Sequence, residues 1–265
     1  MKKLIAMALL ACVCARSEAI VYVKADATGA NSGTSWTDAY TSPFDAIAAA
    51  AGEGADRTIF IAQGVYYISN EYTLPDAIKI YGGFKGDETG TEEEMLAARD
   101  CDEYQTIISA DANKNDKWER FNHTADEWEY PAAEKLDLPI IDPKTKKVNI
   151  PAFTGDFDTY DFPIDYSNFR QKSWFVVPAG MSATFDGLWF TSNWADFGNC
   201  GTINVKGGAD QTVPCYVRNC RFVGLRAFGY REDKHENCDN YLIGCKFFGA
   251  CTAPIAFSSS LIIQD

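Results

Sequence analysis

A mixed-charge segment, Arg231-Glu-Asp-Lys-His-Glu236, holds the first side chains that could carry chemistry. Arg231 or Lys234 could act as a base, and Asp233 could supply a carboxylate. These are groups that proton abstraction from a uronic acid requires. The same composition is typical of an exposed turn between two strands. Arg231, Asp233 and Lys234 are therefore the catalytic candidates, and the exposed turn is the alternative.

A second group is a run of carboxylates, Asp156, Asp158, Asp161 and Asp165, interleaved with aromatic residues. Flexible loops rich in oxygen ligands suit Ca²⁺, so Asp156, Asp158 and Asp161 form the predicted metal site. The spacing differs from an EF-hand loop, because it lacks the glycine at the sharp turn and the closing glutamate. A solvated acidic loop without calcium is the alternative.

Two tryptophans, Trp118 and Trp128, lie in the same part of the chain. Exposed aromatic rings stack on sugar rings, so both are candidate carbohydrate contacts. They could instead pin this segment onto the rest of the fold.

The elements that must position these residues follow from an internal repeat. Tyr216-Val-Arg-Asn-Cys-Arg-Phe-Val-Gly224 matches Tyr241-Leu-Ile-Gly-Cys-Lys-Phe-Phe-Gly249 at a spacing of 25 residues. A weaker copy begins at Thr184, and a fourth begins at Leu261, aligned with Tyr241. Such a period indicates stacked units, and short alternating strands broken by Gly or Asn favour β-strands within each unit. The repeat predicts an all-β fold, a parallel β-helix (solenoid).

Stacking places equivalent residues of successive units above one another. Asn219 takes the corner that Gly244 takes in the next unit, and both residue types tolerate the left-handed conformation. Unpaired cysteine acting as a small hydrophobe is favoured at both repeat positions. The side chains expected to point into the solenoid are Cys220, Phe222, Cys245 and Phe247.

A short helix over residues 43–51 is expected to close the N-terminal end, because an open parallel edge invites aggregation. Ser42 can cap this helix, and Pro43 suits its first position. The predicted buried face consists of Phe44, Ile47 and Ala48.

The first nineteen residues predict export. Lys2 and Lys3 precede the apolar run Leu4–Leu10, and small residues at 17 and 19 suit cleavage. Residues 1–19 are therefore a predicted signal peptide, and the protein is expected to be secreted or at the cell surface. Leu9-Leu-Ala-Cys12 also resembles a lipobox, which would anchor the chain through a lipid at Cys12.

Residues 20–265 form one predicted domain, with an N-terminal cap at 20–57, an insertion at 112–171 and repeat coils at 172–265. The insertion carries five prolines and many charges, so it is expected outside the solenoid with little regular structure. No later segment is long and apolar enough for a transmembrane helix. The fourth repeat stops before its expected Phe, so we expect a longer natural chain, or self-association through the C-terminal edge.

The net charge of the protein limits the kinds of partner it can bind. The whole chain has 24 basic and 37 acidic residues, and removing residues 1–19 leaves 21 and 36, a net charge of −15. Such a surface repels phosphate backbones, which excludes nucleic acid as a partner. The chain also lacks a phosphate-binding loop and a nucleophile elbow.

Several segments resemble the opening of secreted bacterial right-handed parallel β-helix proteins, including polymorphic outer-membrane-protein-like and adhesin-like chains. The segments that carry this resemblance are Ile20–Tyr40, Thr58–Tyr66, Ile78–Phe84, Arg99-Asp100 and Thr106–Asp111. The resemblance implies a right-handed parallel β-helix, a fold that hosts lyases, hydrolases and adhesins alike. It also supports calcium, which secreted β-helix enzymes acting on acidic sugars often use.

No catalytic chemistry is evident, so we expect an extracellular or cell-surface β-helix module for binding or display, with a polysaccharide or a cell-surface ligand as its partner. The alternative is a polysaccharide lyase or glycoside hydrolase that acts on acidic polysaccharide. An enzyme would bring carboxylates together with a lysine or arginine in a groove, whereas a binding module would show scattered charges.

Overall fold

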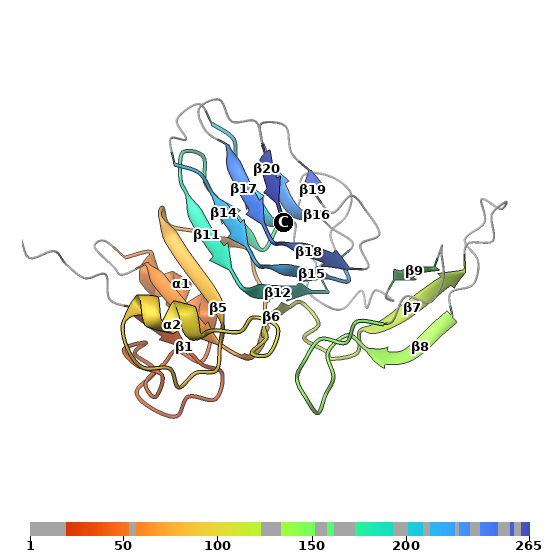
Figure 1. Ribbon diagram of the computed structural model, residues 1–265, viewed down its shortest axis with the longest axis horizontal. Coiled ribbons are helices and arrows are strands. Elements are labelled where there is room, and N and C mark those ends of the chain that lie inside the picture. Colours follow the sequence, from red (N-terminus) through yellow and green to blue (C-terminus); the bar gives the residue numbers. More distant parts are fainter. Residues whose placement is uncertain are drawn as a thin grey trace, which may run out of the picture.

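The computed structural model describes residues 20–52, 57–122, 134–151, 158–161, 173–192, 201–208, 213–225, 228–233, 239–248, 255–256 and 261–265. The described part consists mostly of β-strands in three parallel sheets, with one small antiparallel sheet and two helices. Figure 1 shows strands of the parallel sheets stacked in chain order, with both helices beside the N-terminal strands. Residues 1–19, Trp128, Asp156 and Lys234 lie outside the described residues.

The three parallel sheets are here named A, B and C. Sheet A contains, in spatial order, β1 (Ile20–Val23), β2 (Thr58–Ala62), β5 (Ile78–Phe84), β11 (Ala183–Asp186), β14 (Tyr216–Arg218), β17 (Asn240–Ile243) and β20 (Leu261–Gln264). Sheet B contains β3 (Gly64–Tyr67), β6 (Thr106–Ser109), β12 (Leu188–Thr191), β15 (Arg221–Val223) and β18 (Lys246–Phe248). Sheet C contains β4 (Tyr72–Thr73), β10 (Phe175–Val177), β13 (Gly201–Val205), β16 (Phe228–Glu232) and β19 (Ile255–Ala256).

From β2 onwards the chain visits sheets A, B and C in turn, and each such passage is here called a round. Parallel strands need this kind of crossover, because no hairpin can join them. The arrangement is compatible with the expected β-helix. The apolar runs at 58–62 and 106–109 predict strands, and these are β2 and β6 with the same bounds.

The predicted register of the repeat is confirmed for the first three copies, and it is wrong by one residue for the fourth. Tyr216 pairs with Tyr241, and Thr184 pairs with Tyr216, as the repeat predicts. Tyr241 pairs with Ile262 rather than with Leu261. The alternation of a three-residue apolar run does not distinguish neighbouring registers, so the sequence could not fix this one.

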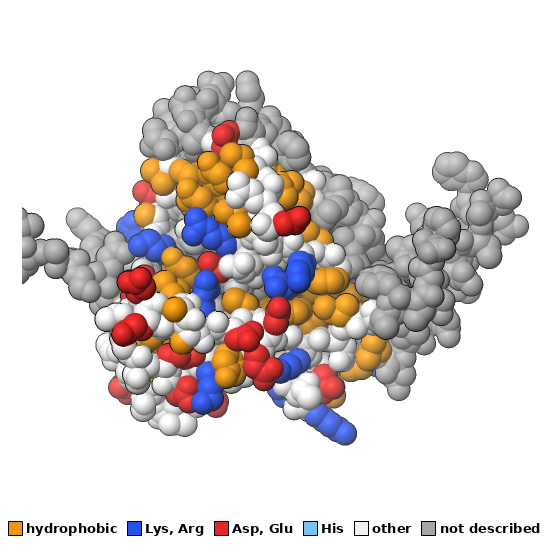
Figure 2. Space-filling view, in the orientation of Figure 1, with side chains coloured by type: hydrophobic (Ala, Val, Ile, Leu, Met, Phe, Trp, Pro, Cys, Tyr) orange, Lys and Arg blue, Asp and Glu red, His pale blue; other side chains and the backbone are white. Residues whose placement is uncertain are grey.

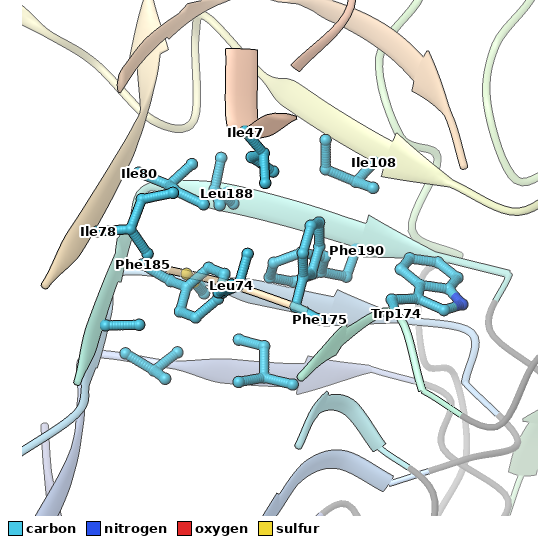
Figure 3. Packing of buried hydrophobic residues seen from close by; sticks show 14 of the residues in the cluster. Ile47, Leu74, Ile78, Ile80, Ile108, Trp174, Phe175, Phe185, Leu188 and Phe190 are labelled. Atoms are coloured by element: carbon cyan, nitrogen blue, oxygen red, sulfur yellow. The ribbon is translucent and has the colours of Figure 1, made fainter. Parts of the chain in front are cut away.

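The three sheets enclose one apolar cluster. Its inward column in sheet B runs from Ile108 through Phe190 and Phe222 to Phe247. Phe222 is 1% exposed and Cys220 is fully buried, while Cys245 and Phe247 are partly buried against the same cluster. All four therefore face the interior, as predicted. Figure 3 shows the neighbouring part of this cluster, with Phe175, Phe185 and Phe190 converging between the sheets.

The turn between sheets A and B is tight and left-handed in successive rounds. Gly187, Asn219 and Gly244 have φ angles of 74°, 50° and 60°. The backbone N–H of Gly187 donates to Arg218, and that of Asn219 donates to Ile243, so each turn is bonded to the next round. The predicted equivalence of Asn219 and Gly244 is confirmed.

The first helix, α1 (Pro43–Ala50), begins at the predicted cap. Ser42 Oγ accepts a bond from the backbone N–H of Phe44, and Pro43 is the first helical residue. Ile47 points from the helix into the interior cluster (Figure 3). Phe44 and Ile47 are buried as predicted, but Ala48 is exposed. The buried stripe is centred on Ala46 and Ile47, which places Ala48 beyond its edge.

A second helix, α2 (Glu92–Ala98), was not predicted. Its start carries a capping box, in which Thr91 Oγ1 accepts from the N–H of Glu94 and the Glu94 carboxylate accepts from the N–H of Thr91. Met95 packs with Phe60 and Phe84 in a cluster on the outside of sheet A. The helix therefore covers strands that would otherwise expose aromatic rings.

A buried ion pair fixes the chain after α2 to sheet A. Arg99 Nη2 lies 3.0 Å from Asp186 Oδ1, and the two side chains are 13% and 6% exposed. Asn219 Nδ2 also donates to Asp186 Oδ1, at 3.0 Å. This network joins the α2 segment to two rounds of the fold.

The insertion contains regular structure, which corrects the expectation of a largely irregular flap. Strands β7 (Lys117–Asn122), β8 (Glu134–Pro139) and β9 (Asp158–Asp161) form an antiparallel sheet in the order β8-β7-β9. Figure 1 shows this sheet projecting to one side of the parallel sheets. The alternation of apolar and polar residues is weak in this segment, so the sequence did not predict these strands. Their pairing satisfies the backbone N–H and C=O groups of the insertion.

Among the described residues, neither α1 nor α2 has the length and apolar character of a membrane-spanning helix.

Candidate functional site

Two adjoining cavities form a groove beside the N-terminal strands. The first has a volume of about 590 Å³ and the second about 670 Å³. They share four lining residues, so we treat them as two lobes of one groove; the shared residues are Lys24, Asp26, Gly86 and Asp87. Each lobe is within the size range of sites for small ligands.

The first cavity, here named the lysine lobe, is defined by five lysines. They are Lys24, Lys85, Lys114, Lys146 and Lys147. Three carboxylates line the same cavity: Asp26, Asp87 and Glu103. The lobe thus has a local surplus of two positive charges in a chain whose net charge is −13.

Sheet A brings the first lysines together. Lys24 directly follows β1 and Lys85 directly follows β5, and β2 lies between these two strands. Because the three strands are parallel, their carboxyl ends meet at one edge. Gln63, which follows β2, donates its backbone N–H to Phe84 O at 2.7 Å. The order of the strands therefore places two distant lysines on one rim.

Gly86 lines both lobes, and its position in the fold requires glycine. Lys24 Nζ donates to Gly86 O at 3.1 Å, and Gly86 has a φ angle of 95°. A Cβ on Gly86 would lie 2.9 Å from Ala62 Cβ and 3.3 Å from Lys24 Cδ. Only glycine fits the backbone conformation and the close approach of the Lys24 side chain.

A hairpin of the insertion supplies the next lysines. Asp142 Oδ1 accepts from the backbone N–H groups of Lys144 and Thr145, which holds the pKa of Asp142 below its ordinary value. Lys146 has a φ angle of 58° and donates its N–H to Asp142 O. The side chain of Lys147 is bound to Glu103, with Nζ 2.8 Å from Oε2. The hairpin is thus fixed against the chain between α2 and β6.

The lysines differ in how far the protein already neutralises them. Lys85 Nζ lies 2.6 Å from Asp87 Oδ2, and this partner raises the pKa of Lys85. Lys114 Nζ lies 5.4 Å from the centre of the Tyr67 ring. Within the described residues, neither Lys114 nor Lys146 pairs with a carboxylate. These two exposed ammonium groups remain available to an anion.

The second cavity, here named the tryptophan lobe, is defined by Trp36. The indole Nε1 donates to Glu88 O at 3.1 Å, and the ring packs edge-on to Tyr22 with centroids 4.8 Å apart. The ring remains partly exposed at the wall of the cavity. Hydroxyl groups and carboxylates complete the lining; they belong to Thr28, Thr34, Ser35, Thr37, Thr89, Asp26, Asp87 and Glu88. A partly exposed ring surrounded by hydroxyls and carboxylates can hold a sugar ring.

The predicted catalytic candidates lie elsewhere. Arg231 Nη2 is 2.9 Å from Asp233 Oδ1, and Arg231 Nη1 contacts Asn204 Oδ1 at 3.4 Å. Both partners belong to the sheet C side of the molecule. The structure brings Arg231 and Asp233 together, but as an ion pair outside the groove. Lys234 falls outside the described residues.

The described residues among the predicted ligand and metal candidates, Trp118, Asp158 and Asp161, do not line the groove either. Trp118 is fully buried, packs with Ile107 and Trp189, and donates Nε1 to Asn149 O at 2.9 Å. Its ring therefore holds the insertion on the outer face of sheet B, which is the alternative considered for it. Asp158 and Asp161 are the first and last residues of β9. Calcium binding there stays a prediction, as does sugar contact at Trp128.

The sequence reading missed every lysine of the groove. Each looks like an isolated surface lysine, because they come from four separate segments of the chain. One signal was present: Lys24 and Lys85 each directly follow an apolar strand. Figure 2 shows acidic and basic side chains mixed over the lower part of the face it presents.

Comparison of the chain with protein-family models, with curated proteins and with solved structures finds no match. The functional conclusion therefore depends on the geometry of the groove.

Proposed function

We propose that this chain is an extracellular, right-handed parallel β-helix module of the adhesin-like kind, and that it binds a glycan in the two-lobed groove. The observation that carries the proposal is the groove itself, in which a partly exposed Trp36 and a set of lysines line adjoining cavities. The regular visits to three parallel sheets and the stacked left-handed turns support the β-helix part.

Binding is preferred over catalysis because most carboxylates of the groove are already engaged by the protein. Asp87 is bound to Lys85, and Glu103 is bound to Lys147. Arg231 and Asp233, the predicted catalytic pair, are bound to each other. General acid–base catalysis needs groups that are free to exchange protons with the substrate. A hydrolase needs two carboxylates near the reacting bond, and among the described carboxylates of the groove only Asp26 is outside an ion pair or a set of backbone hydrogen bonds.

The test is glycan binding by the purified protein, measured by calorimetry against a panel of neutral and acidic oligosaccharides. Trp36→Ala should weaken binding, whereas Trp118→Phe, at a buried tryptophan outside the groove, should not. Product analysis of the same mixtures distinguishes the enzyme: unsaturated or shortened products would replace the binding proposal with the lyase or hydrolase one. If the protein binds none of the glycans in the panel, the glycan-binding proposal is wrong.

Export is part of the proposal and has its own test. The amino terminus of the protein recovered outside the cytoplasm should begin near Ile20, or carry a lipid at Cys12. A chain retained in the cytoplasm with Met1 intact would remove the extracellular role.

A further inference from the structure

The two lobes of the groove have opposite charge. The lysine lobe has five lysines and three carboxylates, whereas the tryptophan lobe has one lysine and three carboxylates. Lys24, Asp26 and Asp87 belong to both linings. The charged residues particular to the lysine lobe are four lysines and one carboxylate, and the one particular to the tryptophan lobe is Glu88. A ligand that spans both lobes meets this change of charge at the residues that line both cavities, among them Lys24 and Asp26.

The available positive charge is concentrated on two side chains. Lys85 and Lys147 are held by Asp87 and Glu103, and Lys24 is held by the carbonyl of Gly86. An anion in the lysine lobe can therefore approach Lys114 and Lys146 without displacing a carboxylate of the protein. Two ammonium groups in one cavity lining, one from the segment after β6 and one from the insertion hairpin, suit a single anionic group.

The tryptophan lobe has the opposite preference. Asp26 forms no ion pair among the described residues, whereas Asp87 is bound to Lys85 and the Glu88 carboxylate accepts backbone N–H groups of the same segment. Carboxylates repel a second anion, but they accept hydrogen bonds from hydroxyl groups. Trp36 is partly exposed in this lining, so this lobe favours an uncharged sugar ring.

We infer that the groove binds a mixed glycan, in which an anionic sugar lies between Lys114 and Lys146 and a neutral sugar next to it lies against Trp36. This inference rests on the proposed glycan-binding function and specifies its ligand. The anion is a uronate carboxylate or a sulfate ester, because both present the same acceptor oxygens to an ammonium group.

The charge of the whole protein excludes ligands of higher charge density. The attraction of the lysine lobe acts over roughly one Debye length, about 8 Å at physiological salt. Beyond that distance a ligand meets a surface with an excess of acidic residues. A homopolymer of uronates would also place a carboxylate beside Asp26 and Glu88. An alternating glycan avoids both penalties.

The experiment is a calorimetric titration of the full chain with four hexasaccharides. One alternates uronate and neutral N-acetylhexosamine, one alternates sulfated and neutral hexose, one contains only uronates, and one contains only neutral hexoses. The two alternating ligands separate the carboxylate from the sulfate source. Binding of at least one of them should be the tightest of the set and should weaken as salt rises.

Matched variants locate the anion. The double variant Lys114→Gln with Lys146→Gln should weaken binding of the alternating glycan by roughly five- to tenfold and reduce its salt dependence. Lys144→Gln, on the same hairpin but outside the groove lining, should leave the affinity unchanged. Binding of the neutral hexasaccharide should be insensitive to all three substitutions.

The outcomes separate the two proposals. If the neutral or the all-uronate ligand binds as tightly as the alternating ones, the mixed-glycan inference is overturned and glycan binding stands. An equal effect of Lys144→Gln and of the double variant overturns it as well. If no hexasaccharide binds, the proposed function fails together with the inference.

Discussion

The ring of Phe247 stacks on the ring of Phe222, with centroids 4.8 Å apart and ring planes 7° apart. Phe222 stacks in turn on Phe190, at 5.1 Å and 24°. The two distances are close to the separation of neighbouring strands in a sheet. Phenylalanines at the same position of successive rounds thus stack on one another, so the sequence repeat places stabilising ring contacts between the rounds.

Truncation of this column should be costly at its middle. Phe222→Ala should lower the free energy of unfolding by about 3–5 kcal/mol, because Phe222 is 1% exposed and has a ring on each side. Phe247→Ala should cost less, because Phe247 is only partly buried. Urea denaturation followed by circular dichroism measures both. Equal losses at the two positions would contradict the described difference in burial.

The left-handed turns predict a graded response to a single methyl group. Gly244→Ala should destabilise by about 1–2 kcal/mol, because an L-residue at φ 60° is strained. Gly187→Ala should cost more, since its Cβ would lie 2.5 Å from Cys101 Sγ and 2.9 Å from the backbone oxygen of Gly82. Thermal unfolding measures the order of the two variants.

Gly244→Asn is the control for this series, because Asn219 already occupies the equivalent turn. It should be more stable than Gly244→Ala. The reverse order would show that the φ angle does not limit this position.

The capping box of α2 predicts a dependence on pH. The backbone N–H of Thr91 lowers the pKa of Glu94. A carboxyl group with a lowered folded pKa stabilises the fold above its unfolded pKa, about 4.3, and this contribution disappears as the pH falls through the folded pKa. Glu94→Gln should therefore be less stable than the parent protein at pH 7, and the difference should close in acid.

Denaturation midpoints of both proteins between pH 7 and pH 2 test this expectation. Thr91→Ala should lower stability over the whole range, because its hydroxyl acts at every pH. A Glu94→Gln difference that stays constant across the range would mean that the charge of Glu94 contributes nothing.

Trp118 should couple the insertion to the parallel sheets. Trp118→Ala removes a fully buried ring that packs on Ile107, Trp189 and Val223, and should cost about 3–5 kcal/mol. Trp118→Phe should cost about 1 kcal/mol, chiefly through the lost bond to Asn149 O. Denaturation and limited proteolysis of the insertion provide the measurement. Unchanged stability of Trp118→Ala would show that the insertion is attached independently of this cluster.

The sequence predicted the strands well where apolar alternation and glycine boundaries agree, as at Thr58–Ala62 and Thr106–Ser109. It missed α2, although the Thr91–Glu94 capping box was present, because the helix is short and buries only Met95. A single buried residue gives no periodicity to detect.

The groove could not be predicted for a different reason. Its lysines acquire meaning only when β1, β2 and β5 are known to be neighbours and the hairpin after Asp142 is known to fold back. Neither the order of the strands in the sheet nor the fold of this hairpin can be read from the order of residues along the chain. The candidates that the sequence did suggest, Arg231 and Asp233, are close together because they alternate along one strand end, and that proximity produced an ion pair.

From β11 onwards the turn between sheets A and B is short in every described round, which has a consequence for how this part of the chain can change in length. One residue separates β11 from β12, and two separate β14 from β15 and β17 from β18. The step from sheet B to sheet C is elastic by comparison: four residues separate β3 from β4, whereas the whole insertion lies between β6 and β10. A foreign peptide grafted between β15 and β16 should therefore be accommodated as the natural insertion is, while a graft at Asn219 should not. In the rounds after β11 the corner between sheets A and B keeps the spacing of the rounds, whereas nearer the N-terminus the same corner carries residues 85–105 with α2.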